Sequence, residues 1–189
     1  MTYAVIEQPS AEPLTLVEVK AHLRLDHPDE DELLNGLIVV ARQSLEAETG
    51  LCLMRQRLRL YLDRWPRNGM IQLLRGPVQS LDAVTVYDAD GTPLSVPVAD
   101  HLLDGDSRPA RLWLRDAPEP GQAINGIEID LTVGFGEAGA DVPGPLIRAM
   151  LIHVGHMFAF RGTLAIDQQP AGVPDGYERL IAGHRMRRL

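Results

Sequence analysis

The segment LTLVEVKAHLRLDHPDEDELLNGLIVVARQSLEAETG, residues 14–50, contains the signals for two consecutive helices. Thr15 and Glu18 form the pattern of a capping box, in which both side chains accept hydrogen bonds from free amides of a helix that begins at Leu16. Pro28 prevents a simple continuation, because the residue before a proline is pushed out of the helical region, and it suits the first turn of a new helix. The second helix is predicted to have a buried stripe and a glycine cap, formed by Leu34, Leu37, Ile38, Ala41, Leu45 and Gly50.

Five carboxylates, one histidine and one proline make up the corner between these helices, Asp26–Glu32. The acids after the proline would lie at the positive end of the second helix dipole, where each contributes up to ~1 kcal/mol. A calcium loop needs acids at alternating positions, a glycine at the sixth and a glutamate at the twelfth. Neither the register from Asp26 nor that from Asp29 supplies this set. The corner is therefore interpreted as the start of a helix and not as a metal site.

The middle of the chain alternates between apolar and polar residues, which is the period of half-buried strands. Residues 57–62 place Leu58, Leu60 and Leu62 on one side. Further strands are predicted at Met70–Leu74, Ala83–Tyr87, His101–Asp104, Ala110–Leu114 and Ile127–Val133. Because prolines and an Asp-Gly pair punctuate this region, we expect a small, mostly antiparallel sheet with many turns. A last helix is predicted over Leu146–Arg161.

Composition and charge are those of a globular chain. It has 189 residues, 45% of them hydrophobic and 23% charged, without the ~18-residue apolar run that a membrane span requires. Cys52 is the only cysteine, which excludes disulfides and cysteine-based zinc sites within the chain. The net charge of −8 argues against broad binding of nucleic acid. An acidic start and a basic end indicate either oriented contacts with other chains or a solvated surface and a frayed terminus.

Two patterns raise the possibility of a ligand site. Gly134–Gly139 matches GxGxxG after a strand, but prolines delay the next helix and no acidic strand end follows at dinucleotide spacing. We interpret it as a loop that ends a strand. His153 and His156 lie three apart on one helix, and nearby sequence offers no further ligand at motif spacing. They are interpreted as histidines at the edge of the core.

For the other charged residues considered, the sequence does not indicate a specific site. Asp63 and Asp104 are candidates for paired acid–base chemistry only as any two acids are, because nothing in the sequence places them in one cleft. Arg55, Arg57 and Arg59 share one face of a strand. That face is either solvated or meets a phosphate or an acidic neighbour, and the sequence does not decide between these.

The order of these elements resembles that of tailed-phage head–tail connector (adaptor) proteins, which also occur in phage-like gene transfer agents. LTLVEVKAHLRLD, the acidic corner and a second helix ending in ETG are similar to the family's opening. WPRNGMIQLLRGPVQSLDAVTVYDADGT, IDLTVGFG and VPGPLIRAMLIHVGHMFAFRG resemble its sheet segment, a strand ending and its last long helix. The tail PDGYERLIAGHRMRRL is similar too, although Gly183 and His184 stand where Pro-Tyr is commoner.

The resemblance implies a structural connector without enzymatic activity, cofactor or metal. Such proteins form a ring, commonly twelve-fold, that docks on the portal protein, and they are often monomeric alone. The ring joins the portal to a tail-side stopper or terminator protein and continues the DNA channel without sequence-specific binding of DNA. The chain is expected to be made in the host cytoplasm and to lie in the neck of a virion or phage-like particle, away from membranes. The alternative is a small cytoplasmic enzyme or nucleotide-binding protein that uses the Gly134–Gly139 loop.

The expected fold is α+β: mainly an α-helical bundle with an inserted small, mostly antiparallel β-sheet and a flexible C-terminal tail. We expect one connector domain over residues 1–162, with helices at about 15–50 and 144–161 and the β insertion at about 55–134. Residues 163–189 are expected to be a flexible basic tail that becomes ordered on the portal or a neighbouring subunit. The predicted partner-binding residues are Tyr177, Arg179, Leu180, Ile181, Arg185, Met186, Arg187 and Arg188.

Overall fold

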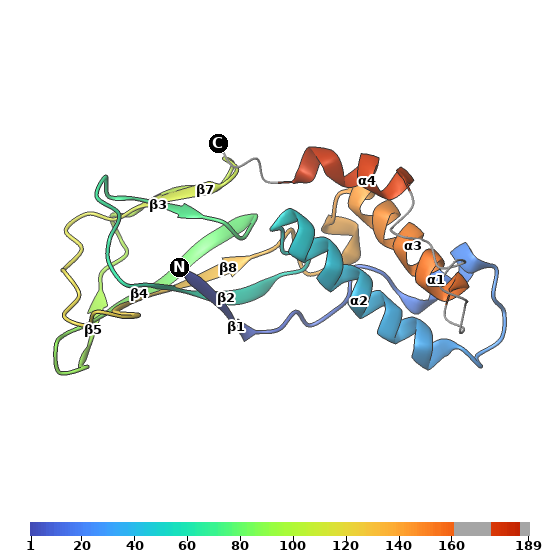
Figure 1. The fold of residues 1–189 in the computed structure, drawn as a ribbon, viewed down its shortest axis with the longest axis horizontal. Coiled ribbons are helices and arrows are strands. Elements are labelled where there is room, and N and C mark those ends of the chain that lie inside the picture. Colours follow the sequence, from blue (N-terminus) through green and yellow to red (C-terminus); the bar gives the residue numbers. More distant parts are fainter. Residues whose placement is uncertain (161–174, 186–189) are drawn as a thin grey trace, which may run out of the picture. The chain divides into compact units, whose positions relative to one another are not determined.

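The computed structural model describes residues 1–160 and 175–185 (Figure 1). This part of the chain has four α-helices and eight strands in two antiparallel sheets, with 32% helix and 29% strand. The expectation of a mainly α-helical bundle is therefore wrong, because strand and helix have nearly equal shares. Two strands were not predicted, β1 (Thr2–Glu7) and β5 (Pro93–Val96). Both are edge strands with mostly exposed side chains, so neither shows a buried face in its sequence.

The chain divides into two compact units, and each is built from two separate stretches of sequence. The β unit comprises Met1–Ser10 and Arg55–Phe135. The helical unit comprises Ala11–Met54 and Gly136–Leu189.

The larger sheet of the β unit has five strands in the order β1-β2-β8-β4-β5, and every neighbouring pair is antiparallel. Its three central strands are β2 (Gln56–Leu62), β8 (Ile127–Val133) and β4 (Val78–Tyr87). Leu58 of β2 lies opposite Leu131 of β8, and both are buried. The alternation of buried and half-buried residues along β2 confirms the predicted strand and its apolar face.

The smaller sheet has the order β3-β7-β6, formed by Met70–Leu73, Ala110–Trp113 and Leu102–Asp104. Figure 1 shows β3 and β7 as a layer distinct from the five-stranded sheet. Ile71, Leu73 and Leu112 are at most 1% exposed, so this sheet also contributes one face to the core of the β unit.

All six predicted strands are present, and only β4 differs greatly from its predicted length. It begins at Val78, five residues before the predicted start at Ala83. Its pairing with β8 shifts register between Val78 and Ser80 and again between Leu81 and Ala83. Each shift breaks the two-residue alternation, which hid the first half of the strand.

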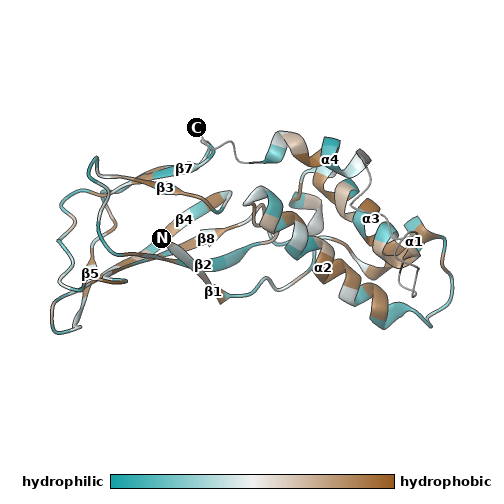
Figure 2. Ribbon diagram, viewed as in Figure 1, coloured by the Kyte–Doolittle hydropathy of each residue, from teal (hydrophilic) through white to brown (hydrophobic). Residues whose placement is uncertain are grey.

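The helical unit contains α1 (Leu16–Leu23), α2 (Asp31–Thr49), α3 (Gly144–Ala159) and α4 (Asp175–Ile181). Two 3-10 turns accompany them, η1 (Gly139–Asp141) and η3 (Ala182–His184). The helix α3 packs against each of the other three helices. Figure 2 shows apolar stretches along α2 and α3, and both helices contribute buried residues to the core of this unit.

The predicted capping box is present at the start of α1. The Thr15 side chain accepts a hydrogen bond from the Glu18 amide at 3.2 Å, and the Glu18 carboxylate accepts one from the Thr15 amide at 2.8 Å. The start of α2 differs from the prediction, because the helix begins at Asp31 and not in the turn of Pro28. The Asp31 amide donates to the Pro28 carbonyl in the turn before the helix. Gly50 caps α2 with φ 75°, a conformation that favours glycine.

Candidate partner-binding region

The segment Asp175–Ile181 forms the helix α4 and is not a flexible tail. It packs against α3, and the side chains of Tyr177 and Ile181 are 0% exposed. The Tyr177 ring lies edge-on to His153 of α3, with 5.5 Å between the ring centroids. Two apolar side chains four residues apart lie on the same face of a helix, and that spacing was the signal in the sequence. This segment therefore contributes to the apolar core of the helical unit.

The basic side chains of the predicted site that are described lie on the solvent side. Arg179 is exposed and Leu180 is half-buried. Arg185 donates to Glu48 of α2 at 3.1 Å and forms an ion pair with Glu178 at 2.8 Å. The hydrogen bond to Glu48, followed by the charge of Glu178, raises the pKa of Arg185. The other predicted residues, Met186, Arg187 and Arg188, lie outside the described residues, as does the rest of the predicted tail.

Two polar atoms are enclosed where α4 meets α3. Among the described residues, neither His153 Nδ1 nor Tyr177 Oη has a hydrogen-bond partner. Burial, and then the neighbouring His156, lower the pKa of His153, while Glu48 opposes them. Burial raises the pKa of Tyr177 to about 12, and the nearby carboxylates act in the same direction. The prediction that the histidines lie at the edge of the core is confirmed, since His153 is 8% exposed and His156 is half-buried.

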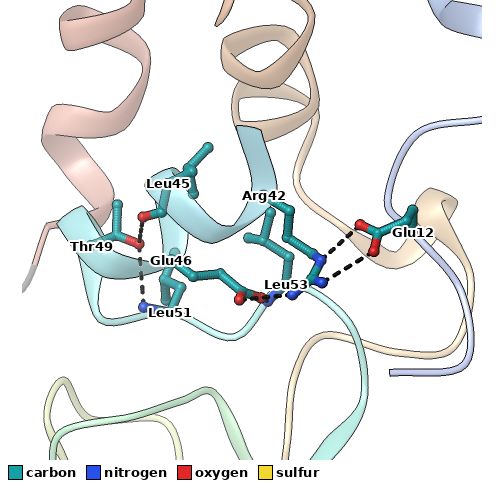
Figure 3. Close-up of polar contacts among 7 residues, drawn as sticks. All are labelled: Glu12, Arg42, Leu45, Glu46, Thr49, Leu51 and Leu53. Atoms are coloured by element: carbon teal, nitrogen blue, oxygen red, sulfur yellow. Dashed lines mark hydrogen bonds and ion pairs between the residues drawn. The ribbon is translucent and has the colours of Figure 1, made fainter. Parts of the chain in front are cut away.

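An enclosed arginine anchors α2 to the chain segment before α1 (Figure 3). Arg42 Nε and Nη2 donate to the two carboxylate oxygens of Glu12 at 2.7 and 3.1 Å, and Nη1 donates to Glu46 at 3.1 Å. The Arg42 side chain is only 7% exposed. Burial alone would lower its pKa, but the hydrogen bonds and charges of Glu12 and Glu46 outweigh burial and raise it. The sequence contained a signal for this network, because Arg42 falls beside Ala41 and Leu45 on the buried stripe.

The same network fixes the way the chain leaves α2. Glu46 also accepts a hydrogen bond from the Leu53 amide at 2.7 Å. Thr49 Oγ1 donates to the Leu45 carbonyl at 2.7 Å and accepts from the Leu51 amide at 3.2 Å (Figure 3). These bonds satisfy buried polar groups that would otherwise cost about 1–3 kcal/mol each. The residues in Figure 3 therefore have a structural role.

The arginines of β2 meet acidic neighbours in their own sheet. Arg57 lies 3.3 Å from Asp82 of β4, and Arg59 binds Asp130 of β8 through two hydrogen bonds of 2.6 and 2.9 Å. Arg59 also lies 2.8 Å from Glu128. The hydrogen bonds to Asp130 raise the pKa of Arg59 against the effect of its burial. Of the alternatives left open by the sequence, the acidic neighbour is therefore correct for these two arginines.

The two acids considered for acid–base chemistry have local partners instead. Asp63 accepts a hydrogen bond from the Asn125 amide at 2.9 Å. Asp104 binds Arg111 and accepts from the Ser107 amide at 3.1 Å. Its bonds to Arg111 and then to Ser107 lower the pKa of Asp104. Both carboxylates stabilise turns of the β unit.

The Gly134–Gly139 loop follows β8 and leads into η1, as predicted for a loop that ends a strand. A side-chain carbon added at Gly136 would lie 2.1 Å from the Asp141 carboxylate. One added at Gly139 would lie 2.2 Å from the Pro13 carbonyl oxygen. These glycines are therefore required for close packing within the helical unit, and the space beside them is filled by the chain itself.

Two further features are absent from the part of the chain that the structure describes. No cluster of three or more histidine, cysteine or acidic side chains has a geometry that could hold a metal ion. None of the helices described is both long and apolar enough to cross a membrane.

Comparison with known proteins finds a family model and solved structures that are similar to this chain. Residues 13–90 match the family model described as phage gp6-like head-tail connector protein. A chain in the neck of an empty gene transfer agent (GTA) particle with C6 symmetry, and one in the virion of a native GTA particle, are each 27% identical to this chain. Each matches with a TM-score of 0.84 over 100% of this chain and 97% of its own. A search of curated proteins found no match.

The resemblance to head–tail connector proteins is confirmed. A further matching chain, from the neck of a native GTA particle with C12 symmetry, is 26% identical with a TM-score of 0.81. These matches support the predicted role as a structural connector and the predicted location in the neck of a phage-like particle. The C6 and C12 symmetries indicate ring assembly in the matched particles.

Proposed function

We propose that this connector assembles as a ring on a portal protein, continues the DNA channel and joins a tail-side stopper or terminator protein. The observation that carries this proposal is the match of the whole chain to neck proteins of particles with C6 and C12 symmetry. A twelve-fold ring in the particle and a monomer in isolation are the states we propose. The net charge of −8 supports a channel lining that DNA passes without sequence-specific binding, since phosphates gain no affinity from an acidic surface.

The proposed contact with the portal or a neighbouring subunit is the C-terminal segment. Tyr177 and Ile181 hold α4 on α3 and so fix where the segment emerges, while Arg179 is exposed to solvent. Arg185 is engaged by Glu48 and Glu178 in the free chain, and an acidic partner surface would compete with these carboxylates. We assign Leu180, Met186, Arg187 and Arg188 to the same contact, with the arginines as charged donors around apolar anchors.

The test is a mixture of the full chain with its portal protein, imaged by electron microscopy. Rings on the portal are expected with the full chain and not after deletion of residues 182–189, which leaves the buried anchors of α4 in place. Charge reversal at Arg185, Arg187 and Arg188 should weaken docking, with a dependence on salt. Reversal of Arg64 and Arg67, which are exposed in the β unit, is the matched control. If the deleted chain forms rings as well as the full chain, the segment is not the contact.

We further propose that the protein has no enzymatic activity. The loop that matches GxGxxG supports this, because Asp141 and Pro13 occupy the positions that a pyrophosphate cradle would leave open. Isothermal titration with NAD and ATP should show no binding. Saturable binding of either nucleotide at micromolar concentration would favour the alternative of a nucleotide-binding protein.

A further inference from the structure

The contact of α4 with α3 combines favourable and unfavourable contributions. Two fully buried side chains, Tyr177 and Ile181, favour docking of α4. The helix has only seven residues, and an isolated helix of that length is not stable in water. Docking also encloses His153 Nδ1 and Tyr177 Oη, which have no hydrogen-bond partner among the described residues. A contact of this composition is held by a small surplus of free energy, so a change at one group can open it.

We infer that α4 is a pH-sensitive latch, docked on α3 while His153 is neutral and released when His153 becomes protonated. The latch regulates the C-terminal contact assigned above, so its use rests on the proposed function. The facing rings of His153 and Tyr177 are the sensing element, because a charged imidazole would have to remain enclosed against the tyrosine while α4 is docked.

The charged and titratable groups around His153 decide the direction. Glu48 of α2 favours its charged form, and His156, one turn further along α3, disfavours it. On the α4 side stand Tyr177, Glu178 and, after η3, Arg185, which is itself paired with Glu48. The side chain of His22 of α1 lies near Gly155 of α3, and His184 belongs to η3. Burial and His156 outweigh Glu48, since the pKa of His153 is lowered.

The sign of the pH effect follows from that direction. The folded chain binds a proton at His153 less readily than the unfolded chain, whose histidines titrate near pH 6.5. Docking of α4 therefore has its full stability above about pH 6.5 and loses stability as the pH falls below that value. Release exposes the apolar side chains of Tyr177 and Ile181 and frees Arg185 from Glu48.

Hydrogen exchange of the full chain, measured by NMR without any portal, tests the latch. Protection factors of amides in α4 should fall by about threefold or more between pH 7.5 and 5.0, while those in α2 should not fall. His153→Phe should remove this dependence, because its ring can pack against Tyr177 but does not titrate. His153→Gln should do the same if α4 remains docked, and His156→Gln, the matched control, should retain the dependence.

Two outcomes would overturn the inference: α4 protection that does not change with pH in the native chain, or the same change in His153→Phe. Because no portal is present, these measurements report on the latch alone. A failure of the C-terminal deletion to prevent ring formation would instead count against the proposed contact and leave the latch result standing.

Discussion

Arg42 and Glu12 are joined by two nearly parallel hydrogen bonds of 2.7 and 3.1 Å, and they tie the middle of α2 to the chain that precedes α1. The arginine side chain is 7% exposed and the glutamate 29%, so the pair is largely shielded from solvent. In such a place the loss of one partner leaves the other charge enclosed, which is far more costly than the pair is worth as a contact.

Glu12→Ala is therefore expected to lower the free energy of unfolding by about 2–3 kcal/mol, measured by urea denaturation. Glu46 remains as a second carboxylate for Arg42, which keeps the loss below that of a fully orphaned charge. The control is Glu7→Gln, because Glu7 is 65% exposed and lies 3.8 Å from Arg57. Its effect should stay within about 0.5 kcal/mol. Equal effects of the two substitutions would show that the Arg42 network has no special role.

Glycines of the helical unit should respond to alanine with opposite signs. Gly36 lies inside α2, and beyond its chain neighbours and the backbone of its own helix no atom lies within 4 Å of an added side-chain carbon, so Gly36→Ala should stabilise the protein by about 0.5–1 kcal/mol. At Gly139 the added carbon would meet the Pro13 carbonyl oxygen at 2.2 Å, and backbone cannot move aside cheaply. Gly139→Ala should cost about 1–3 kcal/mol. Thermal denaturation of both variants checks the pair, and a stabilising Gly139→Ala would contradict the described packing.

The capping box of α1 should be measurable in a single substitution. Thr15→Ala removes the acceptor of the Glu18 amide and is expected to cost about 1 kcal/mol in chemical denaturation. Thr2→Ala, at the exposed start of β1, is the control and should be nearly neutral. The bonds from Thr15 to Glu18 lower the pKa of Glu18, so this stabilisation is present above about pH 4.3 and is lost on acidification. If Thr15→Ala is neutral, α1 does not depend on its cap.

Tyr177 should ionise only at strongly alkaline pH. Its pKa of about 12 lies above the ordinary value near 10, so the neutral phenol is favoured in the folded chain. The corresponding stability is present below about pH 10 and is lost as the pH rises towards 12. Absorbance titration at alkaline pH should show a late step near pH 12 that is missing in Tyr177→Phe and retained in Tyr61→Phe. Loss of the late step from both variants would refute the assignment.

Short sequence patterns predicted much of the fold because they depend on interactions between residues that are close together in the sequence. The capping box at Thr15, the glycine cap at Gly50 and the apolar alternation of β2 each depend on a few neighbouring residues, and each is present. The edge strands β1 and β5 lack such a signal, since their pairing depends on the sheet they join and not on a buried face of their own. That omission made the chain look mainly helical.

The site was less predictable, because its residues acquire their roles from distant partners. Tyr177 and Ile181 were chosen as anchors for a partner, yet α3 of the same chain covers them. The pairs Arg42–Glu12 and Arg59–Asp130 join residues far apart in sequence, and no spacing rule connects them. A charge on the apolar stripe of a helix was the one readable clue to the Arg42 network. The position of Arg42 indicated that its charge needed an acidic partner, but it did not indicate which residue that partner would be.

The division of each unit between two stretches of sequence has a consequence for synthesis and inheritance. During synthesis, β1 can pair with β2 only after α1 and α2 have been made. Likewise, α2 can pack against α3 only after the whole β unit has been made. Pairing at such distances along the chain is slow to form. Three connections join the units, after Ser10, Met54 and Phe135, and a break in any one of them does not separate a complete β unit from a complete helical unit. A contiguous segment that contains the whole of one unit also contains part of the other, so recombination that exchanges a single segment is not expected to exchange either unit alone.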